Sequence, residues 1–337
     1  MKKIVVCGGG NIAHSLAAVI SLHRPVTILT RRPEGWSSRL SIAQSGNRLS
    51  SRFDIAATSD VAVVQGADIL FIALPQFAFE ETLDRIVPWL GAGTTVVFVP
   101  APAKAAEYEA ELAARGCTVV GMQRVPFIAR TVEYGREVSI SAPRRNHRIA
   151  VSNDGAKQGL ARFLPKLFNG DVAFLSSFRI FAFSNSNPLL HPARLVELLR
   201  GGDAGTYSAC PYFYAEWTDA SSDLYVNADR EMFACLRVID PRSAATDYES
   251  VLEHYGVGSC TALTEKIRNI QSFKSIKAPW KQADGGRWTP DFTSRYFTED
   301  IPFGTKVIQD YARKAGIETP TIDYLIENCL SLRKDVP

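Results

Sequence analysis

The chain has 337 residues, of which 46% are hydrophobic and 22% are charged, and its formal net charge is +3. This balance is typical of an ordinary globular protein with ample material for a core, and the length predicts two domains or one large one. So small a charge gives no reason to expect a nucleic-acid or anionic-membrane partner, and no apolar run approaches the roughly 20 residues of a membrane span.

The six cysteines are scattered along the chain and form no Cys-x-x-Cys pair. Cys7 and Cys117 adjoin predicted internal strands, where reduced thiols serve as small hydrophobic groups. We therefore expect a reducing, cytoplasmic location. Lys2 and Lys3 precede an apolar run as in a secretory signal, but three glycines interrupt that run too early.

A short β-rich run, Ile4 to Cys7, leads into three glycines, and a helical pattern begins just after them. Strand, glycine turn and helix are the first parts of a dinucleotide-binding βαβ unit. In the pattern Gly-x-Gly-x-x-Ala, the first glycine makes a tight turn, the second lets the backbone approach a pyrophosphate, and the alanine keeps the helix near the strand. The helix N-terminus adds free N–H groups and a positive dipole end. The predicted cofactor-binding residues of this turn are Gly8, Gly10, Asn11, Ile12 and Ala13.

The second predicted strand, residues 26–30, ends in Thr30-Arg31-Arg32. NAD-binding units place an acidic residue here, which binds the ribose 2′-hydroxyl. A carboxylate would repel a 2′-phosphate, whereas guanidinium groups bind it through charge-assisted hydrogen bonds. The alternative is that both arginines form a solvated loop end. Because this position discriminates between the two cofactors, Thr30, Arg31 and Arg32 favour NADP, with NAD as the alternative.

Strands and helices alternate from residue 54 to residue 121. The apolar strand at 68–74 is continuous, as in a parallel sheet covered on both faces, and it stops at Pro75. The alternation predicts a doubly wound Rossmann-type α/β sheet. Leu74 and Pro75 lie at a strand carboxyl end, where they either wall the nicotinamide or simply end the strand. The other expected elements are strands at 54–58, 94–99 and 117–121, and helices at 60–65, 77–89 and 105–115.

Residues 34–52 are rich in Ser, Gly and Arg and predict loops or a weak hairpin. Strands near 137–142 and 147–152 flank a basic turn at 144–148, which we interpret as a solvated loop rather than a nucleic-acid patch. A helix at 154–168 and a strand at 172–174 complete the first domain, residues 1–177, which we expect to bind NADP.

Helical patterns take over beyond residue 177 and predict a mostly α-helical second domain, residues 178–337, which we expect to bind substrate. A cleft between the two domains is the expected substrate position. The predicted helices span 181–199, 206–217, 222–235, 247–255, 262–272, 304–315 and 319–330, with an irregular loop at 278–290.

Asn187 and His191 lie four residues apart, hence on the same face of a helix. Pro192 has no N–H and clashes with the carbonyl of Pro188, so we expect a kink or a local opening there. Reduction of a carbonyl or an imine needs a proton donor near physiological pH, and His191 is the natural candidate. Asn187 would hold a substrate oxygen or the imidazole. The alternative is a structural histidine with Asn187 as a helix cap.

A third segment, residues 292–304, carries Arg295 and Asp300 just before a predicted helix. Arg295 can bind a substrate carboxylate through two hydrogen bonds, and Asp300 can hold Nδ1 of His191. Alternatively, Asp300 caps the following helix and Arg295 is its surface partner. The aromatic stretch at 207–219 is interpreted as core, with Tyr212, Tyr214 and Glu216 as secondary candidates for the substrate cleft.

With these stretches in hand, the chain resembles the opine dehydrogenases, the octopine and nopaline dehydrogenase family. The resemblance rests on the amino-terminal Gly-Gly-Gly-Asn-Ile-Ala, on Asn187-Pro-Leu-Leu-His-Pro192, and on Arg295-Tyr-Phe-Thr-Glu-Asp-Ile-Pro-Phe-Gly304 with Thr-Pro-Thr-Ile-Asp323 after it. It implies a Rossmann domain joined to a helical opine-dehydrogenase domain. It also implies His191 as the catalytic acid/base, Asp300 as its partner and Arg295 as a contact to the substrate carboxylate.

The family reaction is the reductive condensation of an amino acid with a 2-oxo acid such as pyruvate. The expected partners are these small molecules, no metal is expected, and a homodimer is compatible with the sequence. Two other functions stay open. One is an NADP-dependent carbonyl reductase on the same two-domain plan, which would commonly rely on a lysine that is missing near Asn187. The other is a non-catalytic protein that senses NADP(H).

Overall fold

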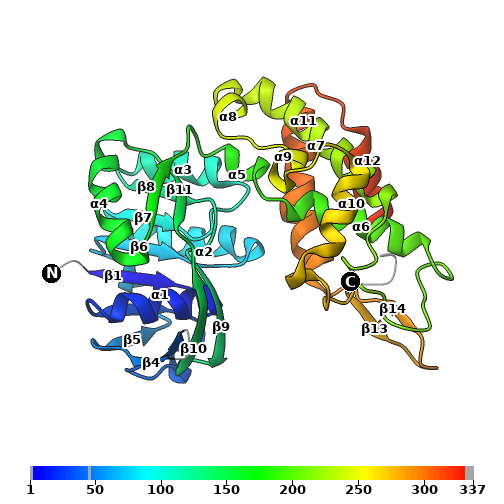
Figure 1. Cartoon of the computed structure of the whole chain (residues 1–337). Coiled ribbons are helices and arrows are strands. Elements are labelled where there is room, and N and C mark those ends of the chain that lie inside the picture. Colours follow the sequence, from blue (N-terminus) through cyan, green and yellow to red (C-terminus); the bar gives the residue numbers. More distant parts are fainter. Residues whose placement is uncertain (1–2, 45–46, 331–337) are drawn as a thin grey trace. The chain divides into compact units, whose positions relative to one another are not determined.

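A computed structural model describes residues 3–44 and 47–330, and the chain divides into two compact units between Phe181 and Ala182 (Figure 1). The sequence placed this division after residue 177. The aromatic rings of Phe178 and Phe181 pack edge to face at 5.8 Å, and the Phe181 ring fills the space beside Gly121 in the first unit. This packing keeps the short segment after residue 177 with the sheet.

The first unit contains an eight-stranded sheet in the order β12-β11-β8-β7-β6-β1-β2-β5. The strands from β5 to β8 are parallel and follow the order of a doubly wound nucleotide-binding sheet, while β11 is antiparallel to β8. The Rossmann-type fold class predicted from the sequence is therefore confirmed. The strands are β1 (Ile4–Cys7), β2 (Val26–Leu29), β5 (Ile55–Thr58), β6 (Ile69–Ile72), β7 (Thr95–Phe98), β8 (Thr118–Met122), β11 (Asn146–Val151) and β12 (Asp171–Phe174).

The central strands β1 and β6 are buried along their whole length, because helices cover both faces of a parallel sheet. Helix α1 packs its buried face, including Leu16 and Ile20, into an apolar cluster of this unit. The helices are α1 (Asn11–Ser21), α2 (Phe79–Ile86), α3 (Ala105–Ala114) and α4 (Lys157–Phe168), with single 3₁₀ turns at η1 (Pro33–Gly35), η2 (Val61–Val64), η3 (Gln76–Ala78), η4 (Val87–Trp89) and η5 (Asp154–Ala156).

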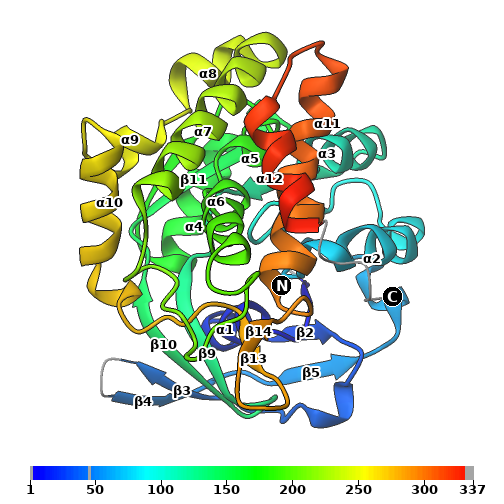
Figure 2. The ribbon, with the colours of Figure 1, turned by 90° about the vertical axis from the view of Figure 1, so that its right-hand side faces the viewer.

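A second, four-stranded sheet in the order β4-β3-β10-β9 lies beside α1 in this unit (Figure 2). It combines β3 (Ser41–Gln44) and β4 (Asn47–Ser50) with β9 (Phe127–Glu133) and β10 (Glu137–Pro143), and β3 pairs in parallel with β10. Two segments that are distant in the chain thus meet next to the glycine turn. The turn between β9 and β10 contacts α1 through a hydrogen bond from the Gly135 N–H to His14.

The second unit is mostly helical, as predicted, and α6 and α7 pack against each other (Figure 1). Its elements are α6 (Asn187–Arg200), α7 (Asp219–Ile239), α8 (Pro241–Thr246), α9 (Val251–Tyr255), α10 (Cys260–Asn269), η6 (Gln271–Phe273), the π-helix η7 (Tyr296–Thr305), α11 (Lys306–Lys314) and α12 (Pro320–Leu330), preceded by α5 (Ile180–Phe183) at the boundary. Across residues 3–44 and 47–330, no helix combines the length and the apolar character needed to cross a membrane.

Three predictions for this unit are wrong. The helix expected at 181–199 is broken between α5 and α6. The helix expected at 206–217 is replaced by an irregular segment, in which Tyr207 bridges to Trp288 and Tyr212 bridges to Lys277. The stretch expected as a loop at 278–290 contains the hairpin of β13 (Trp280–Gln282) and β14 (Trp288–Pro290). Residues 206–217 therefore pair with the distant segment at 277–288 instead of forming the helix that their sequence pattern predicted.

Candidate active site

The glycine turn after β1 has the geometry that a bound pyrophosphate needs. Gly8 has φ +138°, and a Cβ there would lie 2.3 Å from the carbonyl oxygen of Ala73, so only glycine fits. Ala13 is fully buried directly behind this position and keeps α1 close to β1. Gly10 precedes the first residue of α1, and a Cβ there would meet nothing within 4 Å. The helix N-terminus therefore opens onto free space, which suits an anion.

The next two predicted cofactor residues turn their side chains to the protein. Asn11 Oδ1 accepts a hydrogen bond of 2.8 Å from the backbone N–H of Thr131 in β9, and Ile12 packs against the apolar cluster. What they offer at the start of α1 is their backbone N–H groups. Leu74 is half-buried and Pro75 is exposed at the end of β6, the strand next to β1 in the sheet.

The end of β2 carries no carboxylate. Thr30 is buried, whereas Arg31 and Arg32 are exposed. The Arg32 guanidinium lies 4.2 Å from the ring centroid of Tyr134, and the Tyr134 hydroxyl is 3.1 Å from Thr30 Oγ1. Tyr134 belongs to the turn between β9 and β10, and sequence reasoning missed it, because nothing in residues 123–135 points to the distant β2.

His14, which follows the glycines, is fully buried. Its Nε2 accepts a hydrogen bond of 2.7 Å from the Gly135 N–H, so Nδ1 carries the proton and donates it to Gly10 O at 2.9 Å. Burial is the main reason that the pKa of His14 is lowered from 6.5. This neutral imidazole is a bridge between α1 and the β9–β10 turn.

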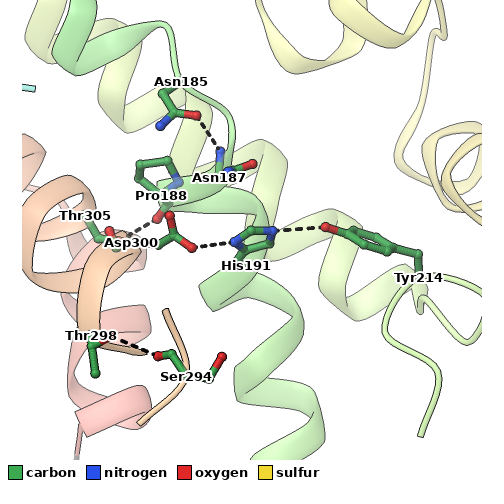
Figure 3. A network of polar contacts seen from close by, with 9 residues as sticks. All are labelled: Asn185, Asn187, Pro188, His191, Tyr214, Ser294, Thr298, Asp300 and Thr305. Carbon is green, nitrogen blue, oxygen red and sulfur yellow. Dashed lines mark hydrogen bonds and ion pairs between the residues drawn. The ribbon is translucent and has the colours of Figure 1, made fainter. Parts of the chain in front are cut away.

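In the second unit, α6 and η7 bring His191 and Asp300 together across 109 positions of sequence (Figure 3). Nδ1 of His191 lies 2.7 Å from Asp300 Oδ2, and the two residues are only 3% and 7% exposed. A carboxylate can only accept a hydrogen bond, so Nδ1 donates and Nε2 keeps a lone pair in the neutral ring. The carboxylate thereby fixes both the orientation and the tautomer of the imidazole.

The lone pair of His191 faces Tyr214, whose hydroxyl is 3.0 Å from Nε2 (Figure 3). Burial, with a smaller contribution from Tyr296, raises the pKa of Tyr214 well above its usual range, so the hydroxyl keeps its proton and donates it to Nε2. The ring of Tyr214 stacks on Phe273 at 4.2 Å, and buried Arg194 holds the preceding Phe213 carbonyl at 3.0 Å. In the sequence, Tyr214 was only a secondary candidate, because the aromatic stretch at 207–219 was interpreted as core.

The helix α6 runs through Pro192 from Asn187 to Arg200, and the effect of the proline is local. Pro192 cannot bond to the carbonyl of Pro188, and that carbonyl instead accepts a hydrogen bond of 2.5 Å from Thr305 Oγ1 (Figure 3). Thr305 lies five residues after Asp300 in η7, and a π-helix places residues five apart nearly above one another. One face of η7 therefore reaches both the His191 ring and the Pro188 carbonyl.

The remaining predicted site residues of the second unit are Asn187, at the start of α6, and Arg295, just before η7. Asn187 is the first residue of α6, and its backbone N–H is capped by Asn185 Oδ1 at 3.2 Å, so Asn187 is not the cap (Figure 3). Both ring nitrogens of His191 are engaged by Asp300 and Tyr214 rather than by Asn187. Arg295 is exposed just before η7.

The first unit, with its glycine turn after β1, places the protein in the Rossmann fold class. Residues 175–332 match the family described as "NAD/NADP octopine/nopaline dehydrogenase, alpha-helical domain". Tauropine dehydrogenase of Arabella iricolor is 27% identical over 97% of this chain and 90% of that protein. An octopine dehydrogenase solved with NADH and L-arginine has a TM-score of 0.85, with 22% identity over 99% of this chain and 90% of that one.

A yersinopine dehydrogenase solved with NADP⁺ has a TM-score of 0.71, with 13% identity over 99% of this chain and 93% of that one. At these identities the two solved structures establish the common fold. The match of the helical domain and the dehydrogenase relative identify the particular group: residues 175–332 belong to the helical-domain family of the octopine and nopaline dehydrogenases, and nearly the whole chain is similar to tauropine dehydrogenase. This is a family of NAD- or NADP-dependent dehydrogenases, as its description states.

Proposed function

We propose that this protein is an opine dehydrogenase that condenses an amino acid with a 2-oxo acid and reduces the imine with NADPH. The observation that carries the proposal is the buried His191–Asp300 pair at 2.7 Å, located in the helical domain that matches the opine dehydrogenases. The unit up to residue 177 would bind the cofactor, and residues 178–337 would bind the substrates. The six free cysteines support a cytoplasmic location for this activity.

The residues proposed to hold the cofactor fit a dinucleotide. Gly10 leaves open space at the start of α1 for a pyrophosphate, Gly8 makes the tight turn, and Ala13 keeps α1 close to β1. Asn11 and Ile12 add backbone N–H groups. Thr30, Arg31 and Arg32 replace the acidic residue of NAD-binding units, which supports NADP over NAD. Leu74 and Pro75 would border the nicotinamide. When bound, NADPH supplies the hydride.

His191 is proposed to move the protons of the reaction. Loss of water from the adduct of amine and carbonyl needs a proton on the departing oxygen, and the reverse reaction needs a base to take it back. An imidazole can do both at Nε2, because Asp300 keeps the other proton on Nδ1. Since the Tyr214 hydroxyl is hydrogen-bonded to Nε2 of His191, we assign Tyr214 to the same proton path.

Asn187 and Arg295 are proposed to hold the substrates. Asn187 lies one helical turn before His191 on the same face of α6, and its side-chain amide can both donate and accept a hydrogen bond. Arg295, exposed before η7, can bind a carboxylate through two parallel hydrogen bonds, and both substrate classes carry one. These two residues would therefore set the orientation of the acids rather than supply protons.

The test is a substrate requirement. Purified full-length protein is mixed with NADPH, a panel of amino acids and a panel of 2-oxo acids, and the absorbance of NADPH is followed. We expect consumption only when both classes are present, together with a secondary amine product in the mass spectrum. Consumption with a 2-oxo acid alone would instead establish a carbonyl reductase, and binding of NADPH without consumption across the panel would establish a sensor.

A further inference from the structure

Tyr134 contacts both ends of the segment Thr30–Arg32. Its hydroxyl is 3.1 Å from Thr30 Oγ1 and 3.5 Å from the carbonyl oxygen of Arg32, and its ring lies 4.2 Å from the Arg32 guanidinium carbon. The backbone N–H of Arg32 in turn points to Thr30 Oγ1 at 3.4 Å. One aromatic side chain thus fixes the segment that follows β2 and supports the cationic group at its end.

Two glycines from different segments make room for this ring. A Cβ at Gly9 would lie 3.0 Å from the Tyr134 hydroxyl oxygen, and a Cβ at Gly35 would lie 2.8 Å from a ring carbon. Real Cβ atoms are almost never as close as the second of these distances, so any larger residue at position 35 would displace the ring. Tyr134 therefore sits against the middle glycine of the dinucleotide turn.

The turn that carries Tyr134 is anchored on two sides. The Gly135 N–H donates to His14 Nε2 in α1 at 2.7 Å, and the Gly135 carbonyl accepts from the Ser37 N–H at 3.0 Å. The Trp36 ring stacks on His14 at 4.3 Å, and the Tyr134 ring meets His14 edge-on at 5.1 Å. The position of Tyr134 relative to the glycine turn is consequently set by α1 and by residues 35–37, not by the β9–β10 turn alone.

We propose that Tyr134 is a specificity-determining residue of the cofactor site and selects the ribose 2′-phosphate. The end of the second strand is where a dinucleotide-binding sheet receives the adenosine ribose. The ring holds the Arg32 guanidinium by a cation–π contact, which reduces the freedom that a long side chain would lose on binding a phosphate. The Tyr134 hydroxyl, which contacts Thr30 Oγ1 and the Arg32 carbonyl, also holds the backbone that carries this guanidinium. This inference rests on the proposed use of NADPH.

The test compares the dissociation constants of NADPH and NADH, measured by nucleotide fluorescence with the purified full-length protein. Arg32→Ala should weaken NADPH by about ten- to a hundredfold, the value of a charge-assisted contact, with little effect on NADH. Tyr134→Leu should reduce the preference for NADPH by about two- to fivefold, the value of an exposed cation–π contact. In the Arg32→Ala background, Tyr134→Leu should reduce that preference no further.

Two controls separate selection from simple packing. Tyr134→Phe keeps the ring and should keep most of the preference. If Tyr134→Leu does not fold, Tyr134→Met, which also lacks an aromatic ring, takes its place. Arg115→Ala removes an exposed arginine at the far end of α3, and it should leave both dissociation constants unchanged.

If Tyr134→Leu weakens NADPH and NADH equally, the tyrosine only packs the turn, and the inference is overturned while NADPH use stands. If the wild-type protein prefers NADH, the proposed cofactor itself fails, and the inference fails with it.

Discussion

The two proposed functional regions of this protein are built in opposite ways. At the glycine turn, residues 8–13 lie together in the chain and act through the backbone: positive φ, close approach and free N–H groups. In the helical unit, the working groups are side chains from three segments, with Tyr214 and Asp300 lying 23 and 109 positions from His191. A site built from backbone groups depends on the backbone conformation, whereas a site built from side chains depends on individual side-chain atoms. Substitutions should therefore affect rate in one region and folding or binding in the other.

The largest effect should come from His191→Ala. Loss of the proposed proton-transferring group should lower kcat by about two to four orders of magnitude, the usual contribution of general acid–base catalysis. The binding of NADPH should stay near the wild-type value, since the proposed cofactor site lies in the other unit. Steady-state kinetics and cofactor titration measure the two quantities. His254→Ala, an exposed histidine in α9, is the matched control and should turn over normally. A His191→Ala enzyme within tenfold of wild type would remove His191 from the mechanism.

Gly8→Ala tests the backbone region. A Cβ at this position would press on the Ala73 carbonyl at 2.3 Å, and the residue would have to keep φ +138°. Such strain costs on the order of 1–3 kcal/mol for the backbone alone, so chemical denaturation should show a lower free energy of unfolding. Gly10→Ala, with open space at its Cβ, is the control for folding and should retain most of the stability. Equal stability of both variants would contradict the close contact described for Gly8.

Tyr214→Phe should have a smaller effect, confined to rate. The substitution removes one hydroxyl and keeps the stacked ring, so kcat should fall by about three- to tenfold, as for the loss of a single hydrogen bond. The rate should fall at every substrate concentration, whereas a role in substrate binding would raise KM. An unchanged kcat would show that protons reach Nε2 without passing through this hydroxyl.

The smallest effect concerns His14 and pH. Because burial lowers its pKa in the folded protein from 6.5, the unfolded chain takes up this proton first as the pH falls, and stability is lost below about pH 6.5. His14→Gln cannot titrate, so its Tm should fall less steeply than that of the wild type between about pH 8 and pH 5. Burial also lowers the pKa of His147, which keeps a residual slope of the same sign in the variant. Parallel Tm curves would exclude this role for His14.

The same contrast explains what could be predicted from the sequence. The glycine turn and the sheet order follow from local patterns, and the spacing of Asn187 and His191 placed them on one helix face. Tyr134 was missed and Tyr214 was only a secondary candidate, because their positions depend on pairings with distant segments: Gly135 with His14, and Tyr212 with Lys277. The meeting of His191 with Asp300 was one of two interpretations of residues 292–304, and the family resemblance implied it, since no spacing along the chain can bring two such distant residues together.

The π-helix η7 adds a constraint on length to the constraint on residue type. In an α-helix, residues five apart point about 140° away from each other, so Asp300 and Thr305 could not both face α6. With one residue fewer between them, the two would lie four apart, and a regular α-helix would place them only about 40° from each other. The five-residue spacing and the π-helical form therefore belong together, because only the wider turn brings residues at this spacing onto one face. A homologous segment with one residue fewer should present the acid and the hydroxyl on one face of an ordinary α-helix instead.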